Sequence, residues 1–73
     1  MGAVHFLDDQ FLLADARDDA VEHELELFET GGKRYLRIWV GGIGNGPEIL
    51  CEITEEQARQ LSEAAESLAD RIS

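Results

Sequence analysis

The sequence predicts an α+β domain, in which an antiparallel sheet of four to five short strands carries one C-terminal amphipathic helix packed on one face. Alternating apolar and polar residues fill most of the first 53 positions, and this period of two is typical of half-buried strands. From position 54 the apolar residues instead recur every three or four positions, which is the helical period. With 73 residues the chain is expected to form a single domain, mainly β over 1–53 and helical over 54–72.

The first twenty residues have the weakest pattern. We expect a strand at 3–7 and a second strand at 10–16, joined by a turn at Asp8 and Asp9. The segment 10–16 is also compatible with a short helix capped by Asp8 or Asp9, because aspartate favours both turns and helix N-caps. Of the two alternatives we favour the strand.

The clearest element is a hairpin over 21–40. Gly31 and Gly32 separate two alternating runs, and a two-residue glycine turn of this kind is typical of hairpins. Cross-strand pairs stabilise a sheet by roughly 0.2–1 kcal/mol each, and a slip of one residue would turn the leucines to solvent. With the turn placed there, five pairs match in character: Leu25 with Ile38, Leu27 with Leu36, Phe28 with Tyr35, Glu26 with Arg37, and Glu29 with Arg34.

A loop and a further strand follow the hairpin. Residues 41–47 are rich in glycine, which predicts a loop. Its spacing matches no phosphate-binding glycine motif, and a strand follows it where a phosphate site needs a helix, so we interpret it as a connection. Residues 48–53 alternate again, with Ile49, Cys51 and Ile53 on one side.

The C-terminal helix begins with a capping box, in which Thr54 and Gln57 each bond the other's backbone N–H. Glu55 and Arg59 form a favourable pair four residues apart. The apolar stripe of the helix is narrow and rich in alanine, which would let it lie close to the sheet. The predicted core combines this stripe with one face of the sheet: Leu25, Leu27, Leu36, Ile38, Ile49, Ile53, Leu61, Ala65 and Leu68.

Charge is the most unevenly distributed property of the chain. The formal net charge is -10, and residues 1–30 hold nine acids against Arg17 alone. Such a field repels nucleic acid and anionic membranes and attracts basic surfaces. We therefore expect a basic protein surface as partner, with no direct nucleic-acid binding and no membrane. Halophilic proteins have a similar composition, so acidity that serves solubility in salt is the alternative.

Residues suited to catalysis or metal binding are sparse. His5 and His23 have no second histidine or cysteine at metal-ligand spacing, and we interpret both as structural. Cys51 is predicted to be a small buried residue. The aspartate clusters at 8–9 and 15–19 lack the order of a calcium loop, which leaves only a weak cation site as an alternative. Without a nucleophile–base pair, we expect no enzyme, no cofactor and no metal.

The outer face of the hairpin is the predicted binding surface. The three glutamates of 22–26 project on one side at intervals of about 6.6–6.8 Å, and aromatic rings lie on the same side. Aromatic residues rimmed by charge are common anchors for a protein partner. The alternative is that the N-terminal segment covers the rings with Phe6, Phe11 or Leu12. The predicted partner-binding residues are Asp15, Asp18, Asp19, Glu22, Glu24, Glu26, Phe28, Tyr35 and Trp39.

In size, acidity and lack of catalytic groups, the chain resembles small phage-encoded inhibitors of the anti-CRISPR and DNA-mimic type. The resemblance is one of general character without a shared motif, so it carries no site residue over. It implies an inhibitor that occupies the basic, nucleic-acid-binding surface of an effector complex or nuclease in the cytoplasm of a bacterial or archaeal host. The single cysteine and the lack of a signal-peptide pattern fit that compartment. The alternative function is a small protein–protein interaction module or homodimeric accessory protein anchored by the aromatic residues of the hairpin.

Overall fold

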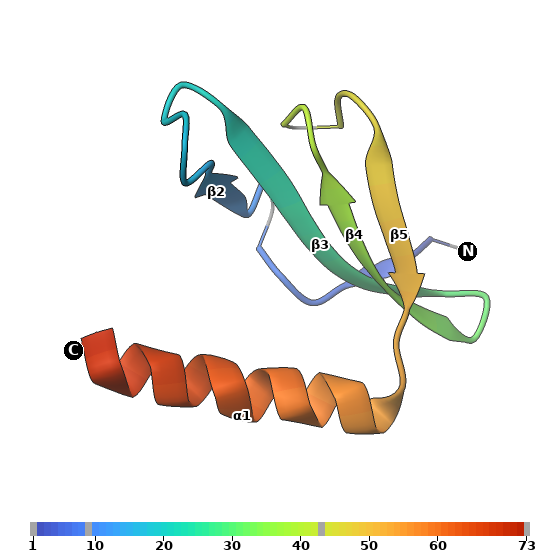
Figure 1. The fold of residues 1–73 in the computed structure, drawn as a ribbon. Helices are drawn as coiled ribbons and strands as arrows, with labels where there is room; N and C mark the ends of the chain where they lie inside the picture. Colours follow the sequence, from blue (N-terminus) through green and yellow to red (C-terminus); the bar gives the residue numbers. More distant parts are fainter. Residues whose placement is uncertain (1, 9, 43, 73) are drawn as a thin grey trace.

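The computed structural model describes residues 2–8, 10–42 and 44–72. It has a five-stranded antiparallel sheet and one C-terminal helix, which confirms the predicted α+β class (Figure 1). Strand β3 is central, because β4 pairs with one of its edges while β1 and β2 share the other, and β5 pairs with the far edge of β4. The elements are β1 Val4–His5, β2 Leu12–Ala14, β3 Glu22–Thr30, β4 Lys33–Trp39, β5 Glu48–Glu52 and α1 Glu55–Ile72.

The two N-terminal strands, β1 and β2, lie end to end along β3. β1 pairs with the end of β3 nearest the hairpin turn, whereas β2 pairs with its beginning, where Leu12 lies opposite Glu24. The predicted strands are therefore present, although shorter than expected, and the helical alternative for 10–16 is wrong. Gln10 has a positive φ of 59°, a conformation that turns the backbone before β2. The predicted turn at Asp8 and Asp9 includes Asp9, which lies outside the described residues.

The hairpin formed by β3 and β4 has the predicted register. All five expected cross-strand pairs are present. Gly31 and Gly32 have φ values of 59° and 78°, and positive φ at both central positions is what a type I′ hairpin turn requires. The next pairing places Cys51 opposite Leu36 and Ile49 opposite Ile38, which extends the aliphatic face of the hairpin across β5.

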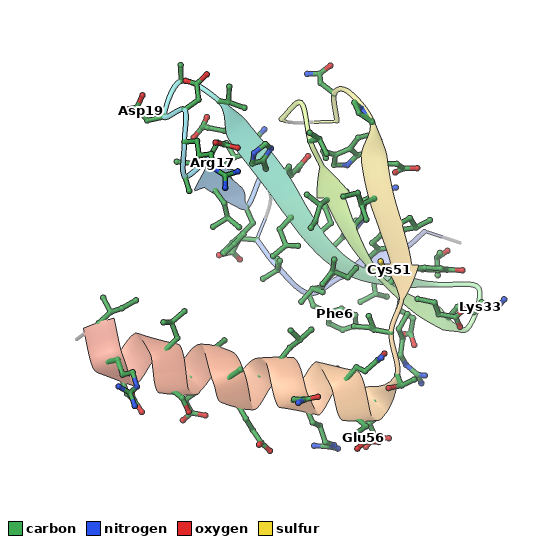
Figure 2. The ribbon with its side chains drawn as sticks, viewed as in Figure 1. Phe6, Arg17, Asp19, Lys33, Cys51 and Glu56 are labelled. Atoms are coloured by element: carbon green, nitrogen blue, oxygen red, sulfur yellow. The ribbon has the colours of Figure 1, made fainter. Side chains whose placement is uncertain are left out.

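The pairing separates the sheet into two unlike faces. Because residues directly opposite each other point to the same side, the register assigns each strand residue to a face. We call one of them the apolar face, and α1 lies on its side of the sheet (Figure 1). Figure 2 shows Phe6 between the sheet and α1, whereas Glu56 points away from the sheet. The apolar residues of this face are Val4, Phe6, Phe11, Leu13, Leu25, Leu27, Leu36, Ile38, Ile49 and Cys51, and its polar residues His23, Glu29 and Arg34 lie near the two ends of β3.

Helix α1 does not close on the apolar face. No residue of α1 comes within 8 Å of a strand residue, measured between Cα atoms of the described residues, and none of its side chains is buried. Leu61 is 47% exposed and Leu68 is 60% exposed, while Ile49 on the sheet is 50% exposed. Ala65 is exposed as well, so the prediction that these four residues lie in a closed core is wrong for the single chain. Cys51, predicted to be buried, is exposed for the same reason. The other five residues of the predicted core, Leu25, Leu27, Leu36, Ile38 and Ile53, are half-buried.

Candidate functional site

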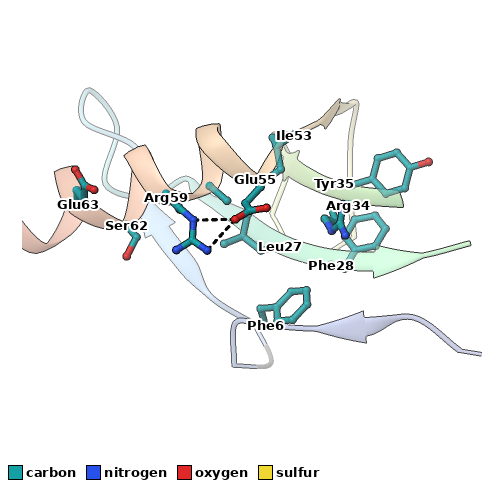
Figure 3. A pocket seen from close by; sticks show the side chains of 11 residues that line it. Phe6, Leu27, Phe28, Arg34, Tyr35, Ile53, Glu55, Arg59, Ser62 and Glu63 are labelled. Carbon is teal, nitrogen blue, oxygen red and sulfur yellow. Dashed lines mark hydrogen bonds and ion pairs between the residues drawn. The ribbon is translucent and has the colours of Figure 1, made fainter. Parts of the chain in front are cut away.

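An open groove of about 630 Å³ lies between the first half of α1 and one corner of the sheet (Figure 3). The sheet side contributes Phe6, Leu27, Phe28, Arg34 and Tyr35. The helix contributes the small residues Ala58 and Ser62 together with Glu55, Arg59 and Glu63. Ile53, in the short connection between β5 and α1, lines the groove where the two elements meet. The groove therefore lies over the apolar face and has mainly apolar walls.

The rim of the groove is polar and ordered. Arg59 donates two hydrogen bonds to Glu55 Oε2, from Nε at 3.0 Å and from Nη2 at 2.8 Å (Figure 3). This confirms the predicted pair four residues apart on the helix. The capping box is also confirmed, because the N–H of Gln57 donates to the Thr54 hydroxyl and the N–H of Thr54 donates to the Gln57 side chain. The start of α1 is therefore held by its own residues.

Beyond the groove, apolar surface continues along the helix. The Cα atoms of the last turns of α1 stay more than 8 Å from those of the strands, and exposure of the stripe rises from 47% at Leu61 to 78% at Ile72. On the sheet, Phe6, Phe11 and Leu13 are also exposed. Contiguous exposed apolar surface of this kind marks interaction sites in proteins. The groove and the apolar surfaces on its two sides are therefore the candidate site.

The outer face of the sheet differs, because its charged and aromatic side chains contact one another. Glu26 Oε1 accepts hydrogen bonds from Arg37 Nε and from Trp39 Nε1, both at 2.7 Å. The Arg37 guanidinium also lies 4.7 Å from the centre of the Phe28 ring and 5.0 Å from that of Trp39, which are cation–π distances. Phe28 stacks on Tyr35 with 5.3 Å between ring centres. These contacts occupy the polar groups at the centre of the outer face, whereas Glu22, Glu48 and Glu52 on the same face are exposed.

The pKa of Glu26 follows from these contacts. The hydrogen bond from Arg37 is the main cause that lowers the pKa of this carboxyl below its ordinary value, and the indole N–H of Trp39 adds to the effect. Partial burial acts in the opposite direction but is the weaker influence. Glu26 is therefore an ionised, internally paired group, as its predicted pairing with Arg37 implied.

The other two glutamates of the predicted row, Glu22 and Glu24, have different environments. Glu24 is only 8% exposed, and its Oε1 accepts a hydrogen bond of 3.0 Å from the N–H of Gly44 in the glycine-rich loop. Glu22 is exposed at the beginning of β3. With Glu26 paired to Arg37, the row presents a single exposed carboxylate. Glu26 bonds neighbouring side chains of the sheet, and Glu24 bonds the backbone of the glycine-rich loop.

The predicted aromatic anchors belong to the outer face by register and are partly covered, but Phe28 and Tyr35 also line the groove at the corner of the sheet. Phe28 is 8% exposed, and Tyr35 and Trp39 are half-buried. The ring of His5 lies 5.7 Å from that of Phe28, so β1 contributes to the cover. The alternative cover by Phe6 and Phe11 is wrong, because pairing with β3 puts both on the apolar face. Leu12, the third residue considered, does lie on the outer face.

Asp15 and His23 form an ion pair that fastens the segment after β2. Asp15 Oδ2 lies 2.8 Å from His23 Nε2, and His23 Nδ1 lies 2.7 Å from the carbonyl oxygen of Val40. The carbonyl of Val40 and the ionised carboxylate of Asp15 can only accept hydrogen bonds. The imidazolium form of His23 satisfies both, because it carries a proton on each ring nitrogen. The hydrogen bond to Asp15 is accordingly the main cause that raises the pKa of His23, and the same bond lowers the pKa of Asp15.

The remaining predicted acids, Asp18 and Asp19, lie in the loop between β2 and β3. Asp18 accepts a hydrogen bond of 3.2 Å from the N–H of Ala20. Asp19 is exposed at the tip of this loop, far from α1 (Figure 2). The predicted acidic residues therefore spread over the loop and the outer face, and none of them lines the groove.

Metal ligands do not gather in the structure. Within residues 2–8, 10–42 and 44–72, no group of three or more histidine, cysteine, aspartate or glutamate side chains is arranged to hold a metal ion. In the same ranges, no helix has both the length and the apolar character needed to cross a membrane.

Comparison of the chain with models of protein families, with curated proteins and with solved structures finds no match in any of the three.

Sequence patterns did not predict the open groove. One compositional signal does point to it. The 18-residue helix carries only three large aliphatic side chains, Leu61, Leu68 and Ile72, and otherwise has alanines on its stripe. So small an apolar stripe gives a helix little burial energy against a sheet.

Proposed function

We propose that this protein is a non-catalytic interaction module that binds a protein partner through the groove and the apolar surfaces beside it. One observation carries the proposal: the apolar stripe of α1 and the apolar face of the sheet lie on the two sides of an open gap, and both are exposed. Covering apolar surface is the main favourable contribution to most protein association. A partner that fills the gap would cover both surfaces together.

The outer face supports this choice of surface by contrast. The carboxylate of Glu26 is bonded to Arg37 and Trp39, and Phe28 is buried. Binding there would have to displace hydrogen bonds already made, and leaving a buried polar group unpaired costs about 1–3 kcal/mol. On the apolar face, the comparable contacts are the pairs of Glu29 with Arg34 and of Asp15 with His23, which lie at the two ends of β3.

The test compares two neighbouring substitutions in α1. Leu68→Asp puts a charge on the apolar stripe, whereas Ser67→Asp adds the same side chain one residue away, outside the stripe. Each protein, carrying an affinity tag, is used to capture partners from the cells that produce it, in the presence of an untagged wild-type copy of the same chain. We expect wild type and Ser67→Asp to retain the same partner, and Leu68→Asp to lose it. Equal retention by all three proteins would overturn the proposal.

The anti-CRISPR-like function, in which the chain occupies a basic nucleic-acid-binding surface, is a second proposal. Its support is the acidic surface away from the groove: Asp19 and Glu22 at one end of the sheet and Glu56 on the helix are all exposed. Since Glu24 and Glu26 have internal partners, a clean test reverses the exposed acids instead. Asp19→Lys with Glu22→Lys should abolish competition with DNA for the partner under this hypothesis, and Leu68→Asp should leave it intact. The reverse pattern would favour the groove.

A further inference from the structure

We infer that the partner covering the groove is a second copy of this chain, in a two-fold dimer whose interface is the apolar face of the sheet together with the apolar stripe of α1. This inference rests on the proposed interaction function and names its partner. In a two-fold dimer the same surface patch meets itself. Each copy would place its α1 stripe against the partner's apolar surface and receive the partner's in return.

The exposed area of the single chain is the first argument. Its accessible surface is 5930 Å², whereas a folded monomer of 8.1 kDa has roughly 4,500 Å². The excess of about 1,400 Å² per chain would bury nearly 3,000 Å² in a dimer, within the range of obligate homodimers, about 2,000–5,000 Å². Among the described residues only one hydrophobic side chain, Phe28, is buried. The chain therefore exposes the additional area expected of one subunit of a dimer.

The chemistry of the two sides of the gap is the second argument. The sheet side offers aliphatic and aromatic residues, and the helix side offers Leu61, Leu68 and Ile72 between alanines. Alanines allow two helices to approach closely, and the leucines can then pack across the two-fold axis. A second copy supplies an apolar helix and an apolar sheet face at once, so it matches both sides of the gap.

The distribution of charge is the third argument. Two copies of net charge -10 repel each other, so an interface must keep acids away from its centre. Glu55 and Glu63 of α1 line the groove, and Glu55 is paired with Arg59. The apolar face of the sheet keeps acids from its centre: its one acid on β3, Glu29, lies at the hairpin end and pairs with Arg34 at 3.5 Å. The free edge of β5 does not, because antiparallel pairing of two β5 strands centred on Leu50 would put Glu48 opposite the other copy's Glu52. The apolar face is therefore a better surface for self-association than the free edge of β5.

The single cysteine provides a test in the unmodified protein. Cys51 lies on the apolar face opposite Leu36 and is exposed in the single chain. Sedimentation and alkylation by neutral iodoacetamide are followed together as the protein concentration rises from about 1 µM to about 1 mM. We expect the dimer fraction to rise and the alkylation rate of Cys51 to fall in parallel, by about 10-fold at saturation. A dimer whose Cys51 reacts at the monomer rate would overturn the inferred interface.

Matched variants test the same interface independently of the thiol. Leu68→Asp should remain monomeric at concentrations where wild type and Ser67→Asp are dimers. Far-UV circular dichroism of all three establishes that α1 is still formed; if Leu68→Asp loses the helix, the wild-type Cys51 result decides alone.

A wild-type protein that stays monomeric over the whole concentration range overturns the dimer. The proposed function is then tested by a separate result, the effect of Leu68→Asp on capture of another protein. If Leu68→Asp still abolishes capture of another protein, the groove binds a different partner. If it does not, both the dimer and the interaction function fail.

Discussion

The carboxylate of Asp15 joins two segments that are separate in the sequence. Its Oδ1 accepts hydrogen bonds from the backbone N–H groups of Arg17 and Asp18, at 2.8 and 3.1 Å, while its Oδ2 meets His23. Because His23 also bonds the carbonyl of Val40, the loop after β2, the strand β3 and the end of β4 are linked by two side chains. The carboxylate of Asp15 therefore stabilises the fold by accepting hydrogen bonds from separate segments of the chain.

The Asp15–His23 pair predicts a dependence of stability on pH. The folded state raises the pKa of His23 above its ordinary 6.5, so its contribution is fully present below pH 6.5 and is lost as pH rises through the raised value. It lowers the pKa of Asp15 below 3.8, so that contribution is present above pH 3.8 and is lost as pH falls through the lowered value. The pair therefore contributes fully between these two ordinary values.

The measurement is urea unfolding of wild type and Asp15→Asn at fixed protein concentration, near pH 5.5 and near pH 9. Asparagine keeps the oxygen that caps the loop but cannot form the ion pair. We expect the stability difference between the two proteins to be larger near pH 5.5 than near pH 9. Asp19→Asn, at an exposed position, should show no such change. A difference independent of pH would contradict the ion pair.

On the outer face, Glu26 likewise accepts hydrogen bonds from two other residues, Arg37 and Trp39. Glu26→Gln keeps its size and removes its charge, which weakens the hydrogen bonds from Arg37 and Trp39. Hydrogen bonds to charged groups contribute about 1.5–3 kcal/mol, so we expect the free energy of unfolding to fall by about 1–3 kcal/mol in a denaturant titration followed by circular dichroism. Glu22→Gln, exposed on the same face, is the control and should change stability by less than about 0.5 kcal/mol. Equal effects of the two substitutions would show that the contacts of Glu26 contribute nothing specific.

At the scale of elements, the hairpin and the helix differ in what supports them. Strands β3 and β4 are paired along their length, and β3 has neighbours on both edges. Helix α1 has a capping box, acids in its first turn and Arg71 in its last turn, all of which match the helix dipole. It lacks tertiary burial, which supplies most helical stability in proteins. In the single chain, α1 therefore depends on its local interactions.

This dependence predicts a clear effect of removing the helix cap. Thr54→Ala deletes the hydroxyl that accepts from the N–H of Gln57, and loss of such a cap costs about 0.5–2 kcal/mol. We expect hydrogen exchange of α1 amides to quicken while exchange in β3 and β4 is unchanged, measured at low concentration where the chain is monomeric. Ser67→Ala, in the middle of the helix, should slow exchange slightly, because alanine is the better helix former. Faster exchange in the sheet as well would mean that α1 and the sheet unfold as one unit.

At the scale of the whole molecule, the chain is more extended than its length requires. The radius of gyration is 13.4 Å, against about 11 Å for a compact domain of 73 residues. The difference comes from α1, which lies off the sheet. Another surface that fills the gap would cover the apolar residues that this open form exposes. Both the proposed interaction function and the inferred dimer depend on this property.

Salt dependence separates self-association from binding to a basic partner. Two copies of charge -10 repel, and the screening length shortens from about 30 Å at 0.01 M salt to about 10 Å at 0.1 M. We therefore expect the dimer to become tighter as sodium chloride is raised, as measured by the concentration dependence of sedimentation. A complex of the acidic surface with a basic partner should become weaker over the same range. Self-association that weakens with salt would contradict an interface centred on apolar contacts.

The sequence by itself determined the features whose cause is local. The period of two identified the strands, two glycines that can adopt positive φ placed the turn, and pairs such as Glu26 with Arg37 set the register. The capping box followed from residues three apart. The short strands β1 and β2 were predicted only in outline, because their pairing with β3 depends on residues distant in the chain.

Only the tertiary structure decided how far α1 stands from the sheet and which acids are free. Periodicity says which side of a helix is apolar, but the separation of the two layers depends on how far the side chains of both reach across the gap. In the same way, a charge count treats Glu22 and Glu24 alike, although one is exposed and the other is buried against the N–H of Gly44. A partner within hydrogen-bond distance is a property of three-dimensional position, and that position moved the candidate site from the charged face to the apolar one.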